Sequence, residues 1–247
     1  MDAFKKYWTY TKGVDFVNED DLQGSLVLGD TYFSLGTQSA TYSNGTTVSD
    51  MFLGLWTPKE RAVRKGKDFS SNSEILVASI TLTENTHPKK EGPRTDGTGP
   101  IGYWTPGNLK NFLQQMGAVL LSGRKISVAD DISDKTQLKL LQNQTLFCSP
   151  DIFYQYKNDD DKTKFIREVF EDYKYDYRIL SPTELSDKIL ADKEPFYYVV
   201  YLHNYVAGKI VAVVNSRTGQ LIYSTRKVSF AAHIKSGDLK DIYKEAR

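Results

Sequence analysis

The sequence predicts an α/β protein (α+β overall), in which a small antiparallel β unit precedes a sheet of βαβα repeats that ends in a β-hairpin. Three observations lead to this prediction. Asn44-Gly45 separates two β-like runs, strand-like and helical patterns alternate between residues 74 and 203, and two further β-like runs flank residues 216–219. Asn-Gly favours a tight hairpin turn, whereas alternating strands and helices indicate right-handed crossovers and a mainly parallel sheet.

The β-rich amino-terminal unit is expected to span residues 1–73, including a polar linker at 58–73. An aromatic-rich stretch that can form a helix opens the chain, with Phe4, Tyr7 and Trp8 close together. β-like runs then follow on both sides of Asn44-Gly45, where both turn positions require a positive φ.

The α/β domain is expected to span residues 74–247, beginning with a central strand at 74–83. Thr105 and Pro106 are typical of an N-cap and a first helical position, and Gly123 of a helix end. The order of elements suggests two βαβα repeats, although any such series resembles itself. The expected parts are a repeat at 74–143, a repeat at 144–203, a hairpin at 209–225, a helix at 133–141 capped by Ser133, a helix from Ser181 and a terminal helix at 238–246.

Composition excludes several classes of protein. The chain has 247 residues with 32 Lys and Arg against 31 Asp and Glu, so its net charge is +1. Nucleic-acid binding driven by bulk charge is not expected, and the basic stretch Lys59–Lys67 lacks interleaved aromatic residues. The single cysteine, Cys148, permits no internal disulfide, and no apolar run is long enough to span a membrane.

One segment resembles a known family. The helix that ends at Leu121-Ser122-Gly123-Arg124, followed by a strand at 125–129 and a short helix, is similar to the TolB amino-terminal region and to curli-secretion-type envelope lipoproteins. The resemblance covers about residues 74–203. It departs from the family pattern in a longer loop and in Asp130-Asp131, where a basic residue is usual. The resemblance implies an envelope protein that binds partners and carries over no catalytic residue.

The long irregular loop 85–104 holds the first candidate binding residues, His87, Arg94, Tyr103 and Trp104. Such a loop in a compact domain is typically either functional or solvated. Tyr103 and Trp104 could form a stacking platform, or a hydrophobic staple on the helix that follows.

Three carboxylates follow predicted strands, at the edge where α/β sheets bind ligands: Asp130, Asp131 and Asp151. They are candidates for binding, and helix capping is the alternative. Tyr197, Tyr201 and Tyr223 are interface candidates, although tyrosine also suits strands by propensity. The spacing of histidines and cysteine suits no metal site, and no cofactor is expected.

The expected function is a non-catalytic, exported or periplasmic envelope protein that binds a protein or an envelope polymer, with a leader or lipid anchor encoded upstream of this sequence. A cytoplasmic location is the alternative. The second hypothesis is a hydrolase-like α/β enzyme that uses strand-end carboxylates beneath the loop 85–104.

Overall fold

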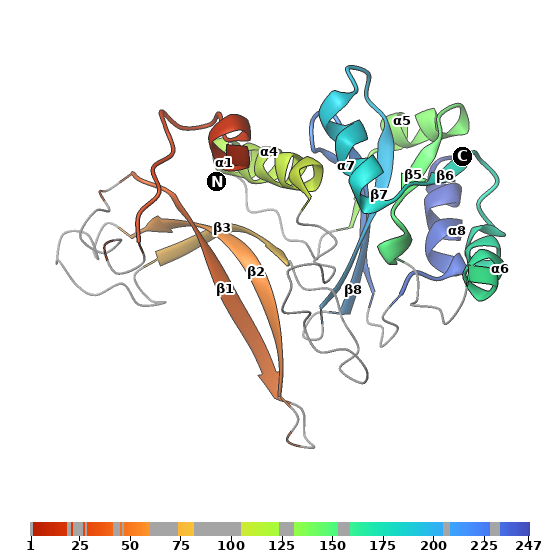
Figure 1. Cartoon of the computed structure of the whole chain (residues 1–247), viewed down its shortest axis with the longest axis horizontal. Coiled ribbons are helices and arrows are strands. Elements are labelled where there is room, and N and C mark those ends of the chain that lie inside the picture. Colours follow the sequence, from red (N-terminus) through yellow and green to blue (C-terminus); the bar gives the residue numbers. More distant parts are fainter. Residues whose placement is uncertain are drawn as a thin grey trace.

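The computed structural model describes residues 2–18, 21, 27, 29–41, 45, 47–59, 74–81, 105–123, 131–152, 159–204, 208–227 and 233–247. These residues form helices, two 3₁₀ turns (η1 and η2) and two β-sheets (Figure 1). The elements are α1 Asp2–Tyr7, β1 Tyr32–Thr41, β2 Thr47–Pro58, β3 Glu74–Thr81, α4 Pro106–Ser122, β4 Ile132–Ser133, α5 Lys135–Leu138, η1 Lys139–Gln142, β5 Leu146–Cys148, η2 Pro150–Ile152, α6 Asp159–Phe170, β6 Tyr177–Ile179, α7 Pro182–Ala191, β7 Tyr197–Asn204, β8 Gly208–Asn215, β9 Leu221–Lys227 and α8 Ser236–Glu245.

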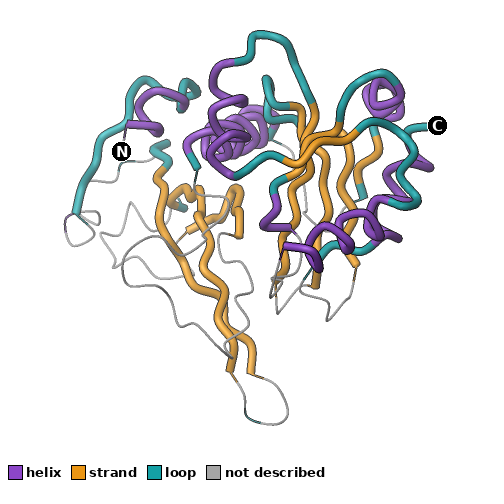
Figure 2. The backbone as a smooth tube through the Cα atoms, turned by 45° about the vertical axis from the view of Figure 1, so that its right-hand side comes forward, coloured by secondary structure: helices purple, strands orange, loops and turns teal. Residues whose placement is uncertain are grey.

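The first sheet is antiparallel and has the strand order β1-β2-β3. β1 and β2 form the hairpin predicted at Asn44-Gly45, with Thr41 opposite Thr47 and Gly45 at a φ of +80°. This positive φ is why glycine suits the turn. The hairpin extends well past α1 and α4 (Figures 1 and 2), so these two helices cover only its base.

The strand predicted at 74–83 lies elsewhere than expected. It forms β3 (Glu74–Thr81), which pairs antiparallel with β2 and belongs to the first sheet, so it is not a central strand of the larger one. Its apolar residues divide between two environments: Val77, Ala78 and Ile80 are partly buried against the core, whereas Ile75 and Leu76 are exposed. An apolar run by itself does not reveal which strand it will pair with. Residues 74–143 therefore do not form one repeat within one sheet, and the expected boundary at 74 does not separate the sheets.

The second sheet is mixed, with the strand order β4-β9-β8-β7-β5-β6. β5 is parallel to both β6 and β7, as the second expected repeat requires, and the other pairs are antiparallel. The prediction of a mainly parallel sheet was wrong because the carboxyl-terminal strands return as a meander of hairpins. Figure 2 shows the strands of this sheet with helices beside them.

The helix-start signals are confirmed at two helices. Thr105 caps α4 by accepting a hydrogen bond from the Asn108 backbone, and Gly123 ends that helix with a left-handed φ of 61°. At α7 the side chains of Ser181 and Glu184 form a complete capping box. The prediction for the helix at 133–141 is corrected: Asp134 is the cap, because Ser133 belongs to β4.

Helix α4 lies between the two sheets (Figure 1) and contributes side chains to both hydrophobic cores. Leu109, Leu113 and Met116 pack with Trp8, Leu53 and Leu55 of the amino-terminal unit. Phe112 belongs instead to the large core around the second sheet. One face of α4 therefore packs on the core of the first sheet, and another face packs on the core of the second sheet.

Gly107 lies where α4 meets α7, and we predict that Gly107→Ala destabilises the protein by about 1–3 kcal/mol, the usual effect of overpacking. A Cβ at residue 107 would lie 2.7 Å from the backbone oxygen and 2.8 Å from the Cα of Ser186. Backbone atoms cannot move aside without shifting α7. Urea unfolding measures the loss, and Gly237→Ala is the control, since a Cβ there meets nothing within 4 Å. Equal stability of the two variants would contradict the prediction.

Candidate functional site

Most of the binding residues predicted from the sequence lie outside the described residues: His87, Arg94, Tyr103, Trp104 and Asp130. Of the other carboxylates, Asp131 is exposed just before β4, and Asp151 lies in η2. The strand predicted at 125–129 also falls outside the described part of the chain.

The three candidate interface tyrosines lie in the core. Tyr197, Tyr201 and Tyr223 are buried in the hydrophobic cluster of the second sheet. Burial raises the pKa of Tyr201 and of Tyr223, and aspartates on α8 raise both further. In this fold the three side chains serve packing and are not available to a partner.

Cys148 is a buried free cysteine in β5. Burial raises the pKa of its thiol strongly, against a smaller opposite effect of a hydrogen bond with the Val199 backbone. Because the thiolate is the nucleophile, this side chain is unreactive. Cys148 therefore serves packing in the core of the second sheet.

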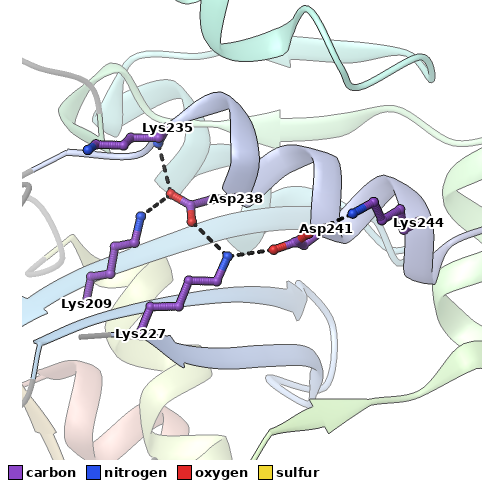
Figure 3. A network of polar contacts seen from close by, with 6 residues as sticks. All are labelled: Lys209, Lys227, Lys235, Asp238, Asp241 and Lys244. Carbon is purple, nitrogen blue, oxygen red and sulfur yellow. Dashed lines mark hydrogen bonds and ion pairs between the residues drawn. The ribbon is translucent and has the colours of Figure 1, made fainter. Parts of the chain in front are cut away.

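A network of ion pairs joins β8 and β9 to α8 (Figure 3). The buried carboxylate of Asp238 accepts from Lys209 Nζ at 2.5 Å, from Lys227 Nζ at 3.3 Å and from the Lys235 backbone N–H at 2.9 Å. Lys227 also pairs with Asp241 at 2.6 Å, and Lys244 lies 3.5 Å from Asp241. The sequence did not reveal this network, because Lys209 stands in an otherwise apolar strand. Both carboxylate oxygens of Asp238 accept hydrogen bonds, so its buried charge is compensated within the network.

His233 lies beside this network, with its ring edge-on to Phe165 at 5.5 Å between ring centroids. Burial lowers the pKa of His233, and the charges of Lys235 and Lys209 lower it further, while Asp238 acts in the opposite direction.

We therefore predict that acidification below pH ~6.5, the usual pKa of an unfolded histidine, destabilises the protein. The unfolded chain takes up the proton first, so the free energy of unfolding falls with pH until the lowered pKa of folded His233 is passed. Urea unfolding between pH ~7.5 and ~5.5 measures the slope. His233→Gln should flatten it, and an unchanged slope in this variant would contradict the assignment.

Some exposed large apolar side chains lie on the first sheet, and others lie elsewhere, among them Leu121 of α4 at 70% and Val27 at 62% exposure. The edge strands of the first sheet carry Leu35, Ile75 and Leu76, which are 57%, 49% and 42% exposed. None of the described strands of the second sheet carries an exposed large apolar side chain. Leu35 lies opposite the buried Leu53, so its side chain points to the same face as the core beneath α1 and α4.

The backbone edges of the two sheets also differ. The outer strands of the second sheet are short: β4 has two residues and β6 has three, including the exposed Arg178. Short or charged edges protect a sheet against pairing with other chains. The outer strand β1 has ten residues, Tyr32–Thr41, and no charged side chain. Among the described residues, no strand pairs with its outer side.

Aromatic rings lie on the face of the first sheet that points away from the buried Leu53. The Phe52 ring covers Gly36 of β1 so closely that a Cβ there would lie 2.4 Å from the ring, and Trp56 covers Gly54 in the same way. The two rings are 6.3 Å apart. Glycine at 36 therefore brings an aromatic ring to the β1 edge.

The structure indicates no metal site and no membrane helix in the parts of the chain that it describes. There, no three His, Cys, Asp or Glu side chains lie close enough together to hold a metal ion. None of the helices described is both long and apolar enough to cross a membrane. No family model, no curated protein and no solved structure matches this chain.

Proposed function

We propose that this chain is a non-catalytic protein that binds a protein partner through the edges of its three-stranded sheet. The observation that supports this proposal is the exposure of Leu35 on β1 and of Ile75 and Leu76 on β3, on either side of β2 with its buried Leu53 and Leu55. Fully burying one such side chain contributes about 1.5–3 kcal/mol, so a partner that covers them gains substantial binding energy.

The same surface favours a protein over a polysaccharide or another envelope polymer. Leucine and isoleucine offer apolar area without hydrogen-bonding groups, and an extended peptide can cover such side chains while it pairs with the backbone of an edge strand. The enzyme alternative has no comparable support among the described residues, where Asp131 is an exposed carboxylate just before β4.

We also propose that the protein is exported to the cell envelope. The resemblance of residues 74–203 supports this location, as does a composition of 16 Tyr against 3 Met. Fractionation of the native host, with detection of the untagged full-length product, tests the proposal. A product confined to the cytoplasm would overturn the location without affecting the binding surface.

A photo-crosslinking residue in place of Leu35 or Ile75 tests the binding function in native cells. We expect a discrete covalent adduct of one mass from these two positions. Leu140 in η1 and Leu190 in α7 are matched controls, since they are 45% and 37% exposed but lie outside the first sheet. Absence of an adduct from positions 35 and 75, or equal adducts from all four positions, would overturn the proposed function.

A further inference from the structure

We propose that the first sheet and α1 open away from α4 as one unit, while α4 stays attached to the second sheet. In the open state, the α4 stripe (Leu109, Leu113 and Met116) and the apolar side of β2 that it covers become accessible. The opening is an equilibrium within one chain, and it does not depend on the proposed binding at the edges of the first sheet.

Directional contacts fix α4 to the second sheet and to α7. The buried side chain of Asn111 accepts a hydrogen bond from the Tyr198 hydroxyl of β7 at 2.9 Å and donates one to the Ser216 carbonyl at 2.9 Å. Three further bonds lead from α4 to α7 and to the turn after β8: Gly107 N–H to Ser186 Oγ at 3.0 Å, Lys110 Nζ to the Ile189 carbonyl at 3.0 Å and Gln114 Nε2 to the Arg217 carbonyl at 3.0 Å. Hydrogen bonds weaken steeply outside a narrow range of length and angle, so α4 cannot shift on this side without breaking several of them at once.

Apolar side chains form the contact between α4 and the first sheet. The α4 stripe packs with Trp8 and with Leu53 and Leu55 of β2. The Tyr10 hydroxyl, which donates to the Gln114 carbonyl at 3.2 Å, adds a partly buried polar bond. Hydrophobic contacts are non-directional, so this surface tolerates sliding and separation that the hydrogen-bonded side of α4 does not.

The two cores also differ in how much they depend on α4. Of the six buried residues described in the core of the first sheet, three come from α4, whereas of the 28 described in the core of the second sheet one does, Phe112. Regions with few buried apolar contacts open at a lower free energy than the rest of a protein, and they open as cooperative units. The first sheet is therefore the part of the described structure that opens first.

Thiol labelling distinguishes the two sides of α4. Met116→Cys places a thiol against the first sheet, and Ser186→Cys places one between α7 and α4, at positions that are 1% and 4% exposed. The native Cys148 is buried in the core of the second sheet, so it reports the opening of that core in each variant. We expect the thiol of Met116→Cys to react with a maleimide about tenfold faster than Cys148 or more, and the thiol of Ser186→Cys to react at the rate of Cys148. The rate at position 116 should also depend less steeply on urea, because opening exposes less surface than global unfolding.

Hydrogen exchange of the unaltered chain tests the same division without a substitution. The informative strand is β2, because it is bonded on both sides, to β1 and to β3. We expect the amides of β2 to exchange about tenfold faster than those of α4 or more, and the amides of α4 to exchange in step with β7 and β8.

Gly117→Ala should shift this equilibrium toward the open state. A Cβ at residue 117 would overlap the Tyr10 ring, so alanine weakens the contact of the amino-terminal unit with α4, although it favours the helix itself. We expect exchange of β2 to become about tenfold faster, with exchange of α4 and labelling of Cys148 unchanged. Gly237→Ala is the matched control, since a Cβ there meets nothing within 4 Å, and it should not raise any of these rates.

Three results would overturn this opening. The thiol of Met116→Cys could react at the rate of Cys148 with the same urea dependence, the thiol of Ser186→Cys could react as fast as that of Met116→Cys, or α4 could exchange in step with β2. If either cysteine variant is unfolded by circular dichroism, hydrogen exchange of the unaltered chain decides alone. None of these results bears on the crosslinks from positions 35 and 75, so the proposed binding function stands or fails separately.

Discussion

Replacing Asp238 by alanine is expected to destabilise the protein by about 3–5 kcal/mol, the typical effect of removing one partner from a buried ion pair. Asp238 is 2% exposed and Lys209 is 4% exposed, with 2.5 Å between their charged atoms. Without the carboxylate, the ammonium group of Lys209 stays buried with no opposite charge. The Lys235 backbone N–H at the start of α8 also loses its acceptor.

Urea unfolding monitored by circular dichroism measures this effect, and Lys209→Met is the informative comparison. In that variant Asp238 keeps Lys227 at 3.3 Å and the backbone N–H of Lys235 at 2.9 Å, so its charge is still compensated. The methionine replaces a buried ammonium with apolar volume. We expect Lys209→Met to be clearly more stable than Asp238→Ala, and the reverse order would contradict our account of the network.

The second large effect is expected at Asn111 in α4, where Asn111→Ala should cost about 2–4 kcal/mol, since an unsatisfied buried polar group costs about 1–3 kcal/mol. The buried Asn111 accepts from the Tyr198 hydroxyl at 2.9 Å and donates to the Ser216 carbonyl at 2.9 Å. These bonds fix α4 to β7 and to the β8–β9 turn. Removing the amide leaves the Tyr198 hydroxyl and the Ser216 carbonyl buried without their hydrogen bonds to Asn111.

A double-mutant cycle with Tyr198→Phe separates the two bonds. Tyr198→Phe removes the hydroxyl and its need for an acceptor, so it should recover part of the loss in the Asn111→Ala background. Ser122→Ala is the surface control, because Ser122 is exposed at the end of α4 and its hydroxyl donates to the Val119 carbonyl of the same helix. Strictly additive effects of the Asn111 and Tyr198 variants would contradict the direct coupling.

Local signals in the sequence predicted the helices well because these signals act over a few residues. Thr105-Pro106 and Gly123 define α4, and Ser181 with Glu184 defines the start of α7, since each satisfies backbone groups within its own turn. The hairpins at Asn44-Gly45 and at Gly219 were predicted for the same reason: a positive φ is a local requirement.

The pairing of distant strands could not be read from the sequence. β3 resembles any buried apolar strand, and only its register with β2 reveals that Ile75 and Leu76 lie at an edge. The tyrosines of β7 and β9 face a core that is complete only when α8 packs on the sheet. The candidate binding edges were missed because the place of β1 and β3 at the edges of the described sheet depends on long-range pairing with β2, which local patterns do not predict.

The position of α4 in the chain also has a consequence for synthesis. Leu53 and Leu55 of the first hairpin are buried by a helix that the ribosome completes roughly 40 residues after β3. At ~5–20 residues per second, the finished strands wait about 2–8 s for that cover. During this time only α1 and Trp8 can cover the apolar side of the nascent hairpin, which lies on the same polysome as identical hairpins from neighbouring ribosomes. Slow translation between residues 82 and 105 should therefore increase aggregation of this protein, and fast translation should reduce it.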